Sequence, residues 1–263
     1  MTKLRIAIHG AAGRMGRRLV ALAAADPQLC VAAALESPQN PFIGHDAGLV
    51  AGAGALGVPM AAELLVPVDV VIDFSVPNAA EAIVETCRQK KLPLVVATTG
   101  FEPEQVEKLR MAAAEIPLLW SPSMSLLVNL AMKLCELAGR ALADKDADVE
   151  ILERHHRFKE DSPSGTALKF GEIIAAEMGH TQHIHGRSGR PGKRPHGEIG
   201  YHAIRVGDNP GEHTIIFAML GETLELTVGA SNRDCYAQGA IAAAKFLAGK
   251  PAGLYGMKDV LGL

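Results

Sequence analysis

The sequence predicts an α/β fold in which a doubly wound, parallel-sheet (Rossmann) domain precedes an α+β domain with a mainly antiparallel sheet. Short apolar runs alternate with helical runs through the first half of the chain. A glycine-rich turn separates the first apolar run from the first helical run. Closely spaced strand-like runs, joined by glycine-containing turns, occupy the region after residue 195.

Five short apolar runs in the first half are expected to be strands, because such runs between helices are typical of a parallel sheet covered on both faces. The expected strands are 4–8, 30–35, 68–74, 94–98 and 118–120. The expected helices are 14–25, which Asp26-Pro27 stops, 77–90, which Pro77 opens, and 104–115.

The pattern changes near residue 125, where we expect a domain boundary. A long helix, a strand and a second helix are followed by three strands and an alanine-rich helix. These elements are expected at 126–142, 148–154, 166–178, 199–206, 213–220, 223–230 and 235–248. We therefore expect a dinucleotide-binding domain at 1–125, onto which 235–263 packs back, and a substrate-binding domain at 126–234.

The composition is that of an ordinary globular protein. The 263 residues are 48% hydrophobic and carry a net charge of -3, so no basic excess indicates nucleic acid or an anionic membrane. No apolar run approaches the roughly 20 residues of a membrane span. The four cysteines are far apart and no export signal precedes them, which predicts reduced thiols and a cytoplasmic protein.

The glycine turn reads Gly10-Ala11-Ala12-Gly13-Arg14-Met15-Gly16. Glycine lets the backbone approach a pyrophosphate, and the helix that follows contributes its partial positive charge. Glu36 stands 20 residues beyond Gly16, at the end of the second strand, where a carboxylate can bind an adenosine ribose. The cofactor is therefore expected to be NADH or NADPH, or else the segment is a tight turn without a ligand.

The residue after Glu36 bears on the choice between the two cofactors. A carboxylate repels the 2′-phosphate of NADPH, and Ser37 brings no compensating cation. The sequence therefore favours NADH, although Arg14 or Arg17 could still serve a phosphate.

Two further segments follow predicted strands at the edge where open α/β sheets bind ligands. Small residues there are expected to leave room for the nicotinamide ring and its ribose, with ordinary loop chemistry as the alternative. The segments are Ala97-Thr98-Thr99 and Ser121-Pro122-Ser123-Met124.

The segment 150–167 concentrates groups that suit proton transfer and carboxylate binding. His155, His156 and Lys159 supply two imidazoles and an ammonium, which act near neutral pH. The Ser164-Gly165-Thr166 turn is expected to open a helix, whose first N–H groups can bind an anion. The alternative is a charged, solvated loop.

Together these motifs resemble the 4-hydroxy-tetrahydrodipicolinate (dihydrodipicolinate) reductase family over nearly the whole chain. The resemblance implies an oxidoreductase of the diaminopimelate route to lysine. It implies that the substrate loses water, that NAD(P)H delivers hydride to ring C4, and that a proton follows. The segments that carry the resemblance are 10–16, 97–101, 153–167, 197–200, 205–208, 211–214, 231–233, 253–255 and 257–261.

The resemblance also implies roles for single residues. His155 and Lys159 would handle the proton, and the sequence does not decide which of them donates it. A small dicarboxylate substrate would be held by His156, Lys159, Ser164, Gly165 and Thr166. A homotetramer built through the sheets of the second domain is expected.

Other interpretations remain open at this point. His180, His183 and His185 cluster in sequence, but we expect no metal because no ligand motif accompanies them. The segment 187–194 is expected to be a loop that closes over an acidic substrate rather than a nucleic-acid arm. The alternatives are another dehydrogenase of an amino-acid precursor, or a nicotinamide-sensing regulator, which would have no use for a proton donor.

Overall fold

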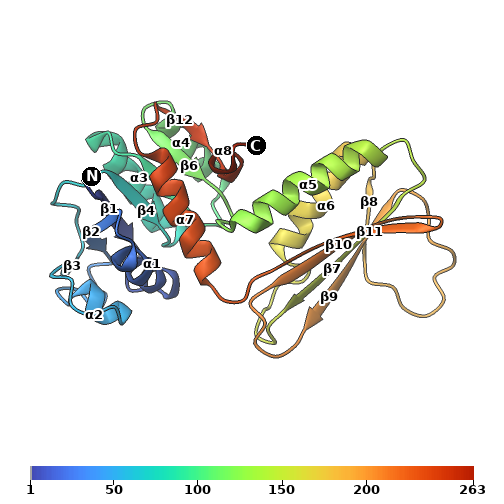
Figure 1. Ribbon diagram of the computed structural model, residues 1–263, viewed down its shortest axis with the longest axis horizontal. Helices are drawn as coiled ribbons and strands as arrows, with labels where there is room; N and C mark the ends of the chain where they lie inside the picture. Colours follow the sequence, from blue (N-terminus) through green and yellow to red (C-terminus); the bar gives the residue numbers. More distant parts are fainter. Residues whose placement is uncertain (1) are drawn as a thin grey trace. The chain divides into compact units, whose positions relative to one another are not determined.

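A computed structural model describes residues 2–263 of the protein (Figure 1). The chain divides into two compact units, which are described separately. The first contains the residues up to Leu126 together with Arg233–Leu263, and the second contains Leu127–Asn232. No helix within residues 2–263 is long and apolar enough to cross a membrane.

The first unit contains a seven-stranded sheet in the order β12-β6-β5-β4-β1-β2-β3, and its strand pairs are all parallel. The strands are β1 (Leu4–His9), β2 (Leu29–Leu35), β3 (Met60–Ala61), β4 (Val70–Asp73), β5 (Leu94–Val96), β6 (Pro117–Trp120) and β12 (Gly253–Tyr255). The helices are α1 (Arg14–Ala25), α2 (Ala47–Ala51), α3 (Pro77–Lys90), α4 (Pro103–Ala113), α7 (Asp234–Leu247) and α8 (Met257–Leu261).

Each face of this sheet has its own hydrophobic core. Along β1, Ile6 and Ile8 pack in the core that α1 and α7 share, and Ala7 packs in the core under α3 and α4. This period of two is what a strand buried on both faces requires. Helices α1 and α7, far apart in sequence, lie side by side (Figure 1). The predicted doubly wound fold is confirmed.

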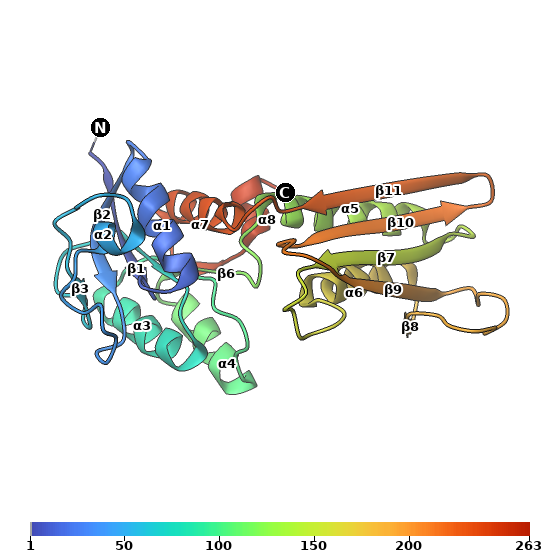
Figure 2. The same cartoon turned by 90° about the horizontal axis from the view of Figure 1, so that it is seen from below.

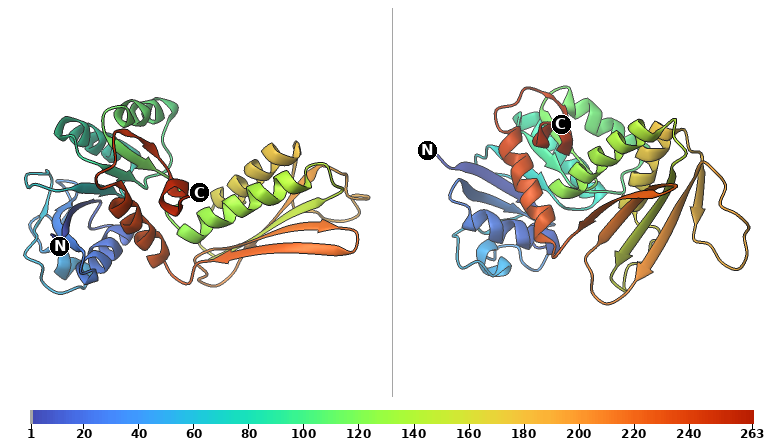
Figure 3. Two further views of the ribbon diagram at one scale, coloured as in Figure 1. Left: turned by 45° about the horizontal axis from the view of Figure 1, so that its top comes forward. Right: turned by 45° about the vertical axis from the view of Figure 1, so that its right-hand side comes forward.

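The second unit is a five-stranded sheet in the order β11-β10-β7-β9-β8, with two helices on one face (Figures 2 and 3). The strands are β7 (Asp148–His155), β8 (Gln182–His185), β9 (Glu198–Arg205), β10 (Glu212–Met219) and β11 (Glu222–Gly229). The helices are α5 (Leu126–Leu142) and α6 (Gly165–Met178).

This second sheet is mixed. Strand β10 is antiparallel to both β7 and β11, whereas β9 is parallel to both β7 and β8. The expected antiparallel pairing therefore holds for one half only. The reason is that β9 and β10, although consecutive in sequence, do not form a hairpin, because β7 lies between them.

Candidate functional site

The glycine turn of the first unit joins β1 to α1 through close backbone contacts. Gly10 has φ +78°, and a Cβ there would lie 2.6 Å from the carbonyl oxygen of Phe74. A Cβ on Gly16 would lie 2.1 Å from the oxygen of Gly10. Neither position has room for a side chain. The glycines therefore allow a tight turn between β1 and α1, and Gly13 is the N-cap of the helix.

Glu36 lies at the end of β2 and binds the same turn. Its Oε2 accepts a hydrogen bond from the N–H of Ala12 at 2.9 Å, and its Oε1 accepts one from the N–H of Ser37 at 3.0 Å. Glu36 also borders a cavity of about 520 Å³. The cavity is lined by His9, Gly10, Gly13, Glu36, Ser37, Pro38, Ala62, Phe74, Ser75, Val76, Ala79 and Ala82.

These features fit a dinucleotide. The cavity has the size of a small-molecule site, it lies at the carboxyl ends of β1, β2 and β4, and Gly10 and Gly13 line it without side chains. Arg17, one of the cations considered for a phosphate, donates from Nε to the oxygen of Ala12 at 2.8 Å and lies over the ring of Phe42. Arg14 is exposed.

A polar network that the sequence did not single out lies beside this cavity. The fully buried Asp73, at the end of β4, accepts hydrogen bonds from Ser75 Oγ and Thr98 Oγ1, both at 2.6 Å. His9 Nδ1 lies 2.7 Å from the same carboxylate. The only sign of this network in the sequence is an aspartate at the end of an otherwise apolar strand. Its partners lie at or just after the ends of three different strands, so their proximity could not be read from the sequence.

The other predicted cofactor residues differ in exposure. Thr98 is 4% exposed, and its hydroxyl both donates to Asp73 and accepts from the N–H of Ser75. Met124 is 2% exposed and belongs to the core shared with α7. Thr99, Pro122 and Gly13 are exposed; Ala97, Ser123 and Met15 are half-buried; Ala11, Ala12 and Ser121 are buried.

In the second unit, His155 ends β7 and is held by a buried carboxylate. Its Nδ1 lies 2.6 Å from Oε2 of Glu153, which is 1% exposed. Burial lowers the pKa of His155, and the neighbouring Glu153 offsets this only in part. Burial alone would raise the pKa of Glu153, but hydrogen bonds from Arg205 and His155 lower it overall.

The start of α6 is tied to the same carboxylate. Ser164, the N-cap, donates its N–H to Glu153 Oε1 at 3.0 Å, and its hydroxyl accepts from the N–H of Ala167 at 3.1 Å. His213 Nε2 lies 2.9 Å from that hydroxyl, and burial lowers the pKa of His213 to about 4, so its ring is neutral. The next residues, Gly165 and Thr166, are exposed and half-buried.

The loop between β7 and α6 carries the predicted ammonium. Lys159 Nζ lies 2.7 Å from Asp161 Oδ1. The backbone N–H of His156 donates to the oxygen of Asn209 at 2.8 Å, and within the described residues the buried Nδ1 of His156 has no hydrogen-bond partner. One continuous segment, from the end of β7 to the first turn of α6, thus contains His155, His156, Lys159 and Ser164–Thr166.

The segment 187–194 does not take the expected position over a substrate within its own unit. Arg187 and Arg194 both donate to the carboxylate of Glu150 on β7. Glu150 is five residues from His155 along the strand, a distance of about 17 Å at the usual rise. The two guanidinium groups therefore hold this loop near the start of β7, away from the His155 end.

Two of the three clustered histidines contact Tyr201, whereas His180 packs edge-on against the ring of His196 and its buried Nδ1 has no hydrogen-bond partner within the described residues. His183 Nδ1 lies 2.8 Å from the hydroxyl of Tyr201, and His185 stacks on the same ring. Among residues 2–263, no group of three or more histidine, cysteine or acidic side chains is arranged to hold a metal ion. The expectation that no metal is bound stays a prediction.

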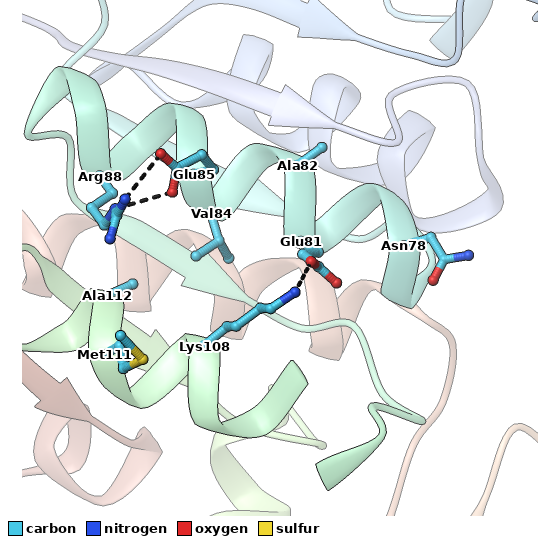
Figure 4. Close-up of a pocket in the computed structure, with 9 residues that line it drawn as sticks. All are labelled: Asn78, Glu81, Ala82, Val84, Glu85, Arg88, Lys108, Met111 and Ala112. Carbon is cyan, nitrogen blue, oxygen red and sulfur yellow. Dashed lines mark hydrogen bonds and ion pairs between the residues drawn. The ribbon is translucent and has the colours of Figure 1, made fainter. Parts of the chain in front are cut away.

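A separate groove of about 460 Å³ lies between α3 and α4 (Figure 4). Lys108 contacts Glu81 across it, and Arg88 pairs with Glu85 along α3. These four charged side chains pair with one another, and none of the predicted site residues lines the groove.

Comparison with known proteins places the chain in a family. The model for the N-terminus of dihydrodipicolinate reductase matches residues 4–124, and the model for its C-terminus matches residues 128–261. The chain belongs to the dihydrodipicolinate reductase family. A reductase family with a Rossmann unit implies a nicotinamide cofactor and a small substrate.

Individual relatives of this reductase family match along their full length. The chain is 56% identical to the 4-hydroxy-tetrahydrodipicolinate reductase of Rhodopirellula baltica, covering 99% of this chain and 96% of the relative. It is 47% identical to the enzyme of that name from Alkalilimnicola ehrlichii, covering 98% and 99%. The fold resembles a dipicolinate-bound dihydrodipicolinate reductase from Paenisporosarcina, with a TM-score of 0.80 at 24% identity over 98% of this chain and 99% of that one.

Proposed function

We propose that this protein reduces 4-hydroxy-tetrahydrodipicolinate, by way of dihydrodipicolinate, to tetrahydrodipicolinate in the diaminopimelate route to lysine, with NADH or NADPH as reductant. The observation that carries the proposal is the full-length identity of 56% to a relative that bears this enzyme name. The loop from His155 to Thr166 supports it, because it joins proton-transfer groups to an anion-binding helix start.

The start of α6 would bind a substrate carboxylate. Ser164 caps the helix, so the N–H groups of Gly165 and Thr166 have no partner within the helix and carry its partial positive charge. The imidazole of His156 and the ammonium of Lys159 come from the adjoining loop. This set matches the two negative charges of a small dicarboxylate.

Lys159 and His155 would handle the proton, with Lys159 as the donor and His155 assisting. When bound, a reduced nicotinamide would supply a hydride to ring C4 of the substrate. The negative charge left on the substrate ring is stabilised by the ammonium of Lys159, which can also donate the proton. His155 holds its Nδ1 against Glu153, so its Nε2 is the ring nitrogen available to assist this transfer.

The first unit would prefer NADH. Among the described residues that line its cavity there is no lysine or arginine, and Glu36 places a carboxylate beside Ser37 where a 2′-phosphate would need a cation. The turn residues 10–15 would hold the pyrophosphate. The segments at Ala97–Thr99 and Ser121–Met124 would border the nicotinamide.

A homotetramer formed through the second unit is also proposed. The face of its sheet that α5 and α6 leave open carries Leu152, Ile204 and Ile216 among polar and charged side chains such as Glu150, Arg154 and His202. Such a face is suited to a symmetric contact with another copy. Sedimentation should give the mass of four chains of 27.7 kDa each, and a monomer mass at working concentrations would contradict this. The cytoplasmic location stays a prediction.

A coupled assay tests the reaction. A synthase generates the substrate from pyruvate and aspartate semialdehyde, and the absorbance of NADH or NADPH is followed. We expect oxidation of the cofactor only when the synthase is present, with a higher kcat/KM for NADH. If neither cofactor is consumed although NADH binds, the proposed substrate is wrong.

A further inference from the structure

Glu153 connects three segments of the second unit through one carboxylate. Its Oε2 contacts His155 Nδ1 at 2.6 Å, its Oε1 accepts from the Ser164 N–H at 3.0 Å, and Arg205 donates to both oxygens at 2.7 Å. The carboxylate is buried, and Arg205 on β9 is its counter-ion. A buried carboxylate with a bidentate guanidinium partner holds a fixed orientation.

This contact decides how the His155 imidazole is protonated. An ionised carboxylate accepts hydrogen bonds only, so Nδ1 must carry a proton, and in the neutral ring that burial favours Nε2 has the lone pair. Nε2 lies beside Gly211, where a Cβ would be only 2.8 Å away. The glycine therefore keeps room next to the nitrogen that Glu153 leaves available.

The same carboxylate also positions the helix start. Because Ser164 donates its N–H to Glu153, the N-cap of α6 is fixed relative to the end of β7. Arg205 adds a further bond from Nη2 to the oxygen of Asp161 at 2.7 Å, within the same loop. The carboxylate of Glu153 thus fixes the position of both the His155 imidazole and the turn that opens α6.

We propose that Glu153 is a positioning residue that fixes the Nδ1–H tautomer of His155 and, at the same time, the place of the α6 N-terminus, with Arg205 as its counter-ion. The proposal rests on the proposed reduction for what His155 and the turn do. The buried carboxylate of Glu153 contacts His155, Ser164 and Arg205, and it acts through His155 and Ser164.

The test is Glu153→Gln, whose amide can donate to Nδ1 and so favour the Nε2–H tautomer. Imidazole ¹⁵N shifts, with His155 assigned by His155→Gln, should show Nδ1–H in the unaltered protein and Nε2–H in the variant. We expect kcat to fall on the order of 10²-fold, the size of a general acid–base contribution. The Kd for NADH, measured by fluorescence, should stay unchanged.

Glu150→Gln is the matched control. Glu150 also lies on β7 and accepts from two arginines and His202, but it does not contact His155. Its substitution should leave the His155 tautomer and kcat near those of the unaltered protein. If Glu153→Gln does not fold because Arg205 is left uncompensated, Glu153→Gln with Arg205→Gln removes both charges and is measured in its place.

Unchanged kcat in the folded variant, or a tautomer that does not change, overturns the proposal. An Nε2–H tautomer in the unaltered protein overturns it as well. Failure of the reduction itself is recognised separately, because the unaltered protein would then consume no cofactor while the tautomer measurement still reports on Glu153.

Discussion

Lys159 Nζ lies 2.7 Å from Asp161 Oδ1, so the loop holds its key ammonium against a carboxylate of its own. The Asp161 side chain is 60% exposed, and ion pairs of this kind contribute only about 0–1 kcal/mol. A substrate carboxylate offers Lys159 the same type of partner. The pair therefore keeps the ammonium of Lys159 near the turn, and a substrate carboxylate can replace Asp161 as its partner at little cost.

Replacement of this lysine tests its role in proton transfer. Lys159→Ala should lower kcat on the order of 10²- to 10⁴-fold, because it removes both the proton donor and the cation beside the developing charge. The Kd for NADH should be nearly unchanged, since the residues expected to bind it belong to the other unit. Lys169→Ala, which removes an exposed lysine paired with Glu172 on α6, is the control. Full turnover in Lys159→Ala would falsify the assignment.

Cofactor preference is expected to depend on Glu36. Glu36→Arg replaces a carboxylate that repels the 2′-phosphate of NADPH with a cation that attracts it. The ratio of kcat/KM for NADPH over NADH should therefore rise by roughly 10-fold or more, which corresponds to about 1.4 kcal/mol. The substitution also removes the acceptor of the Ala12 N–H, so KM for NADH should rise. Glu107→Arg, a charge reversal on the surface of α4, should leave the ratio unchanged. A ratio that stays constant in Glu36→Arg would contradict the account.

Thr98 and Thr99 are neighbours that differ in burial, so they form a matched pair for testing how much the Asp73 network contributes to stability. Thr98→Val removes a donor to the buried Asp73 and an acceptor for the Ser75 N–H, which should lower the free energy of unfolding by about 1–3 kcal/mol. Thr99 is exposed, so Thr99→Val should change it by less than about 0.5 kcal/mol. Urea denaturation measures both, and equal losses would show that the Asp73 network has no special weight.

The buried His213 should make the free energy of unfolding depend on pH. The folded protein keeps this ring neutral down to a pKa of about 4, whereas the unfolded chain takes up the proton near the ordinary value of 6.5. Acidification therefore favours unfolding: the stability is full above pH 6.5 and decreases as the pH falls toward 4, by an amount on the order of 3 kcal/mol. His213→Gln should flatten the plot of denaturation midpoint against pH in this window, and the exposed His185→Gln should not. A His213→Gln plot as steep as that of the unaltered protein would exclude this cause.

The sequence predicted the long elements well because their signals are local. The ends of α1, α3 and α5 agree with the expected 14–25, 77–90 and 126–142, since proline, a change of pattern or an apolar stripe marks them. Strands β3, β8 and β12 were missed. They have two to four residues at sheet edges, and β8 is mostly exposed, so no apolar run announces them.

The site was predictable only where its residues are neighbours in sequence. His155, His156, Lys159 and Ser164–Thr166 follow one another, and one loop carries them. The role of Glu153 was hidden because its main partner, Arg205, is 52 residues away and meets it only when β7 and β9 pair. Asp73 was hidden for the same reason, since Thr98 reaches it from the end of another strand.

The return of Arg233–Leu263 to the first unit has a consequence for synthesis on the ribosome. Helix α7 contributes Ala237, Ala240 and Ala244 to a core that β1 and α1 began more than 200 residues earlier. The second unit is complete once Asn232 has emerged, but the first must wait for α7 to cover one face of its sheet. The first unit thus keeps an apolar face of its sheet uncovered until α7 has emerged, and the unit made later is the first that can be finished.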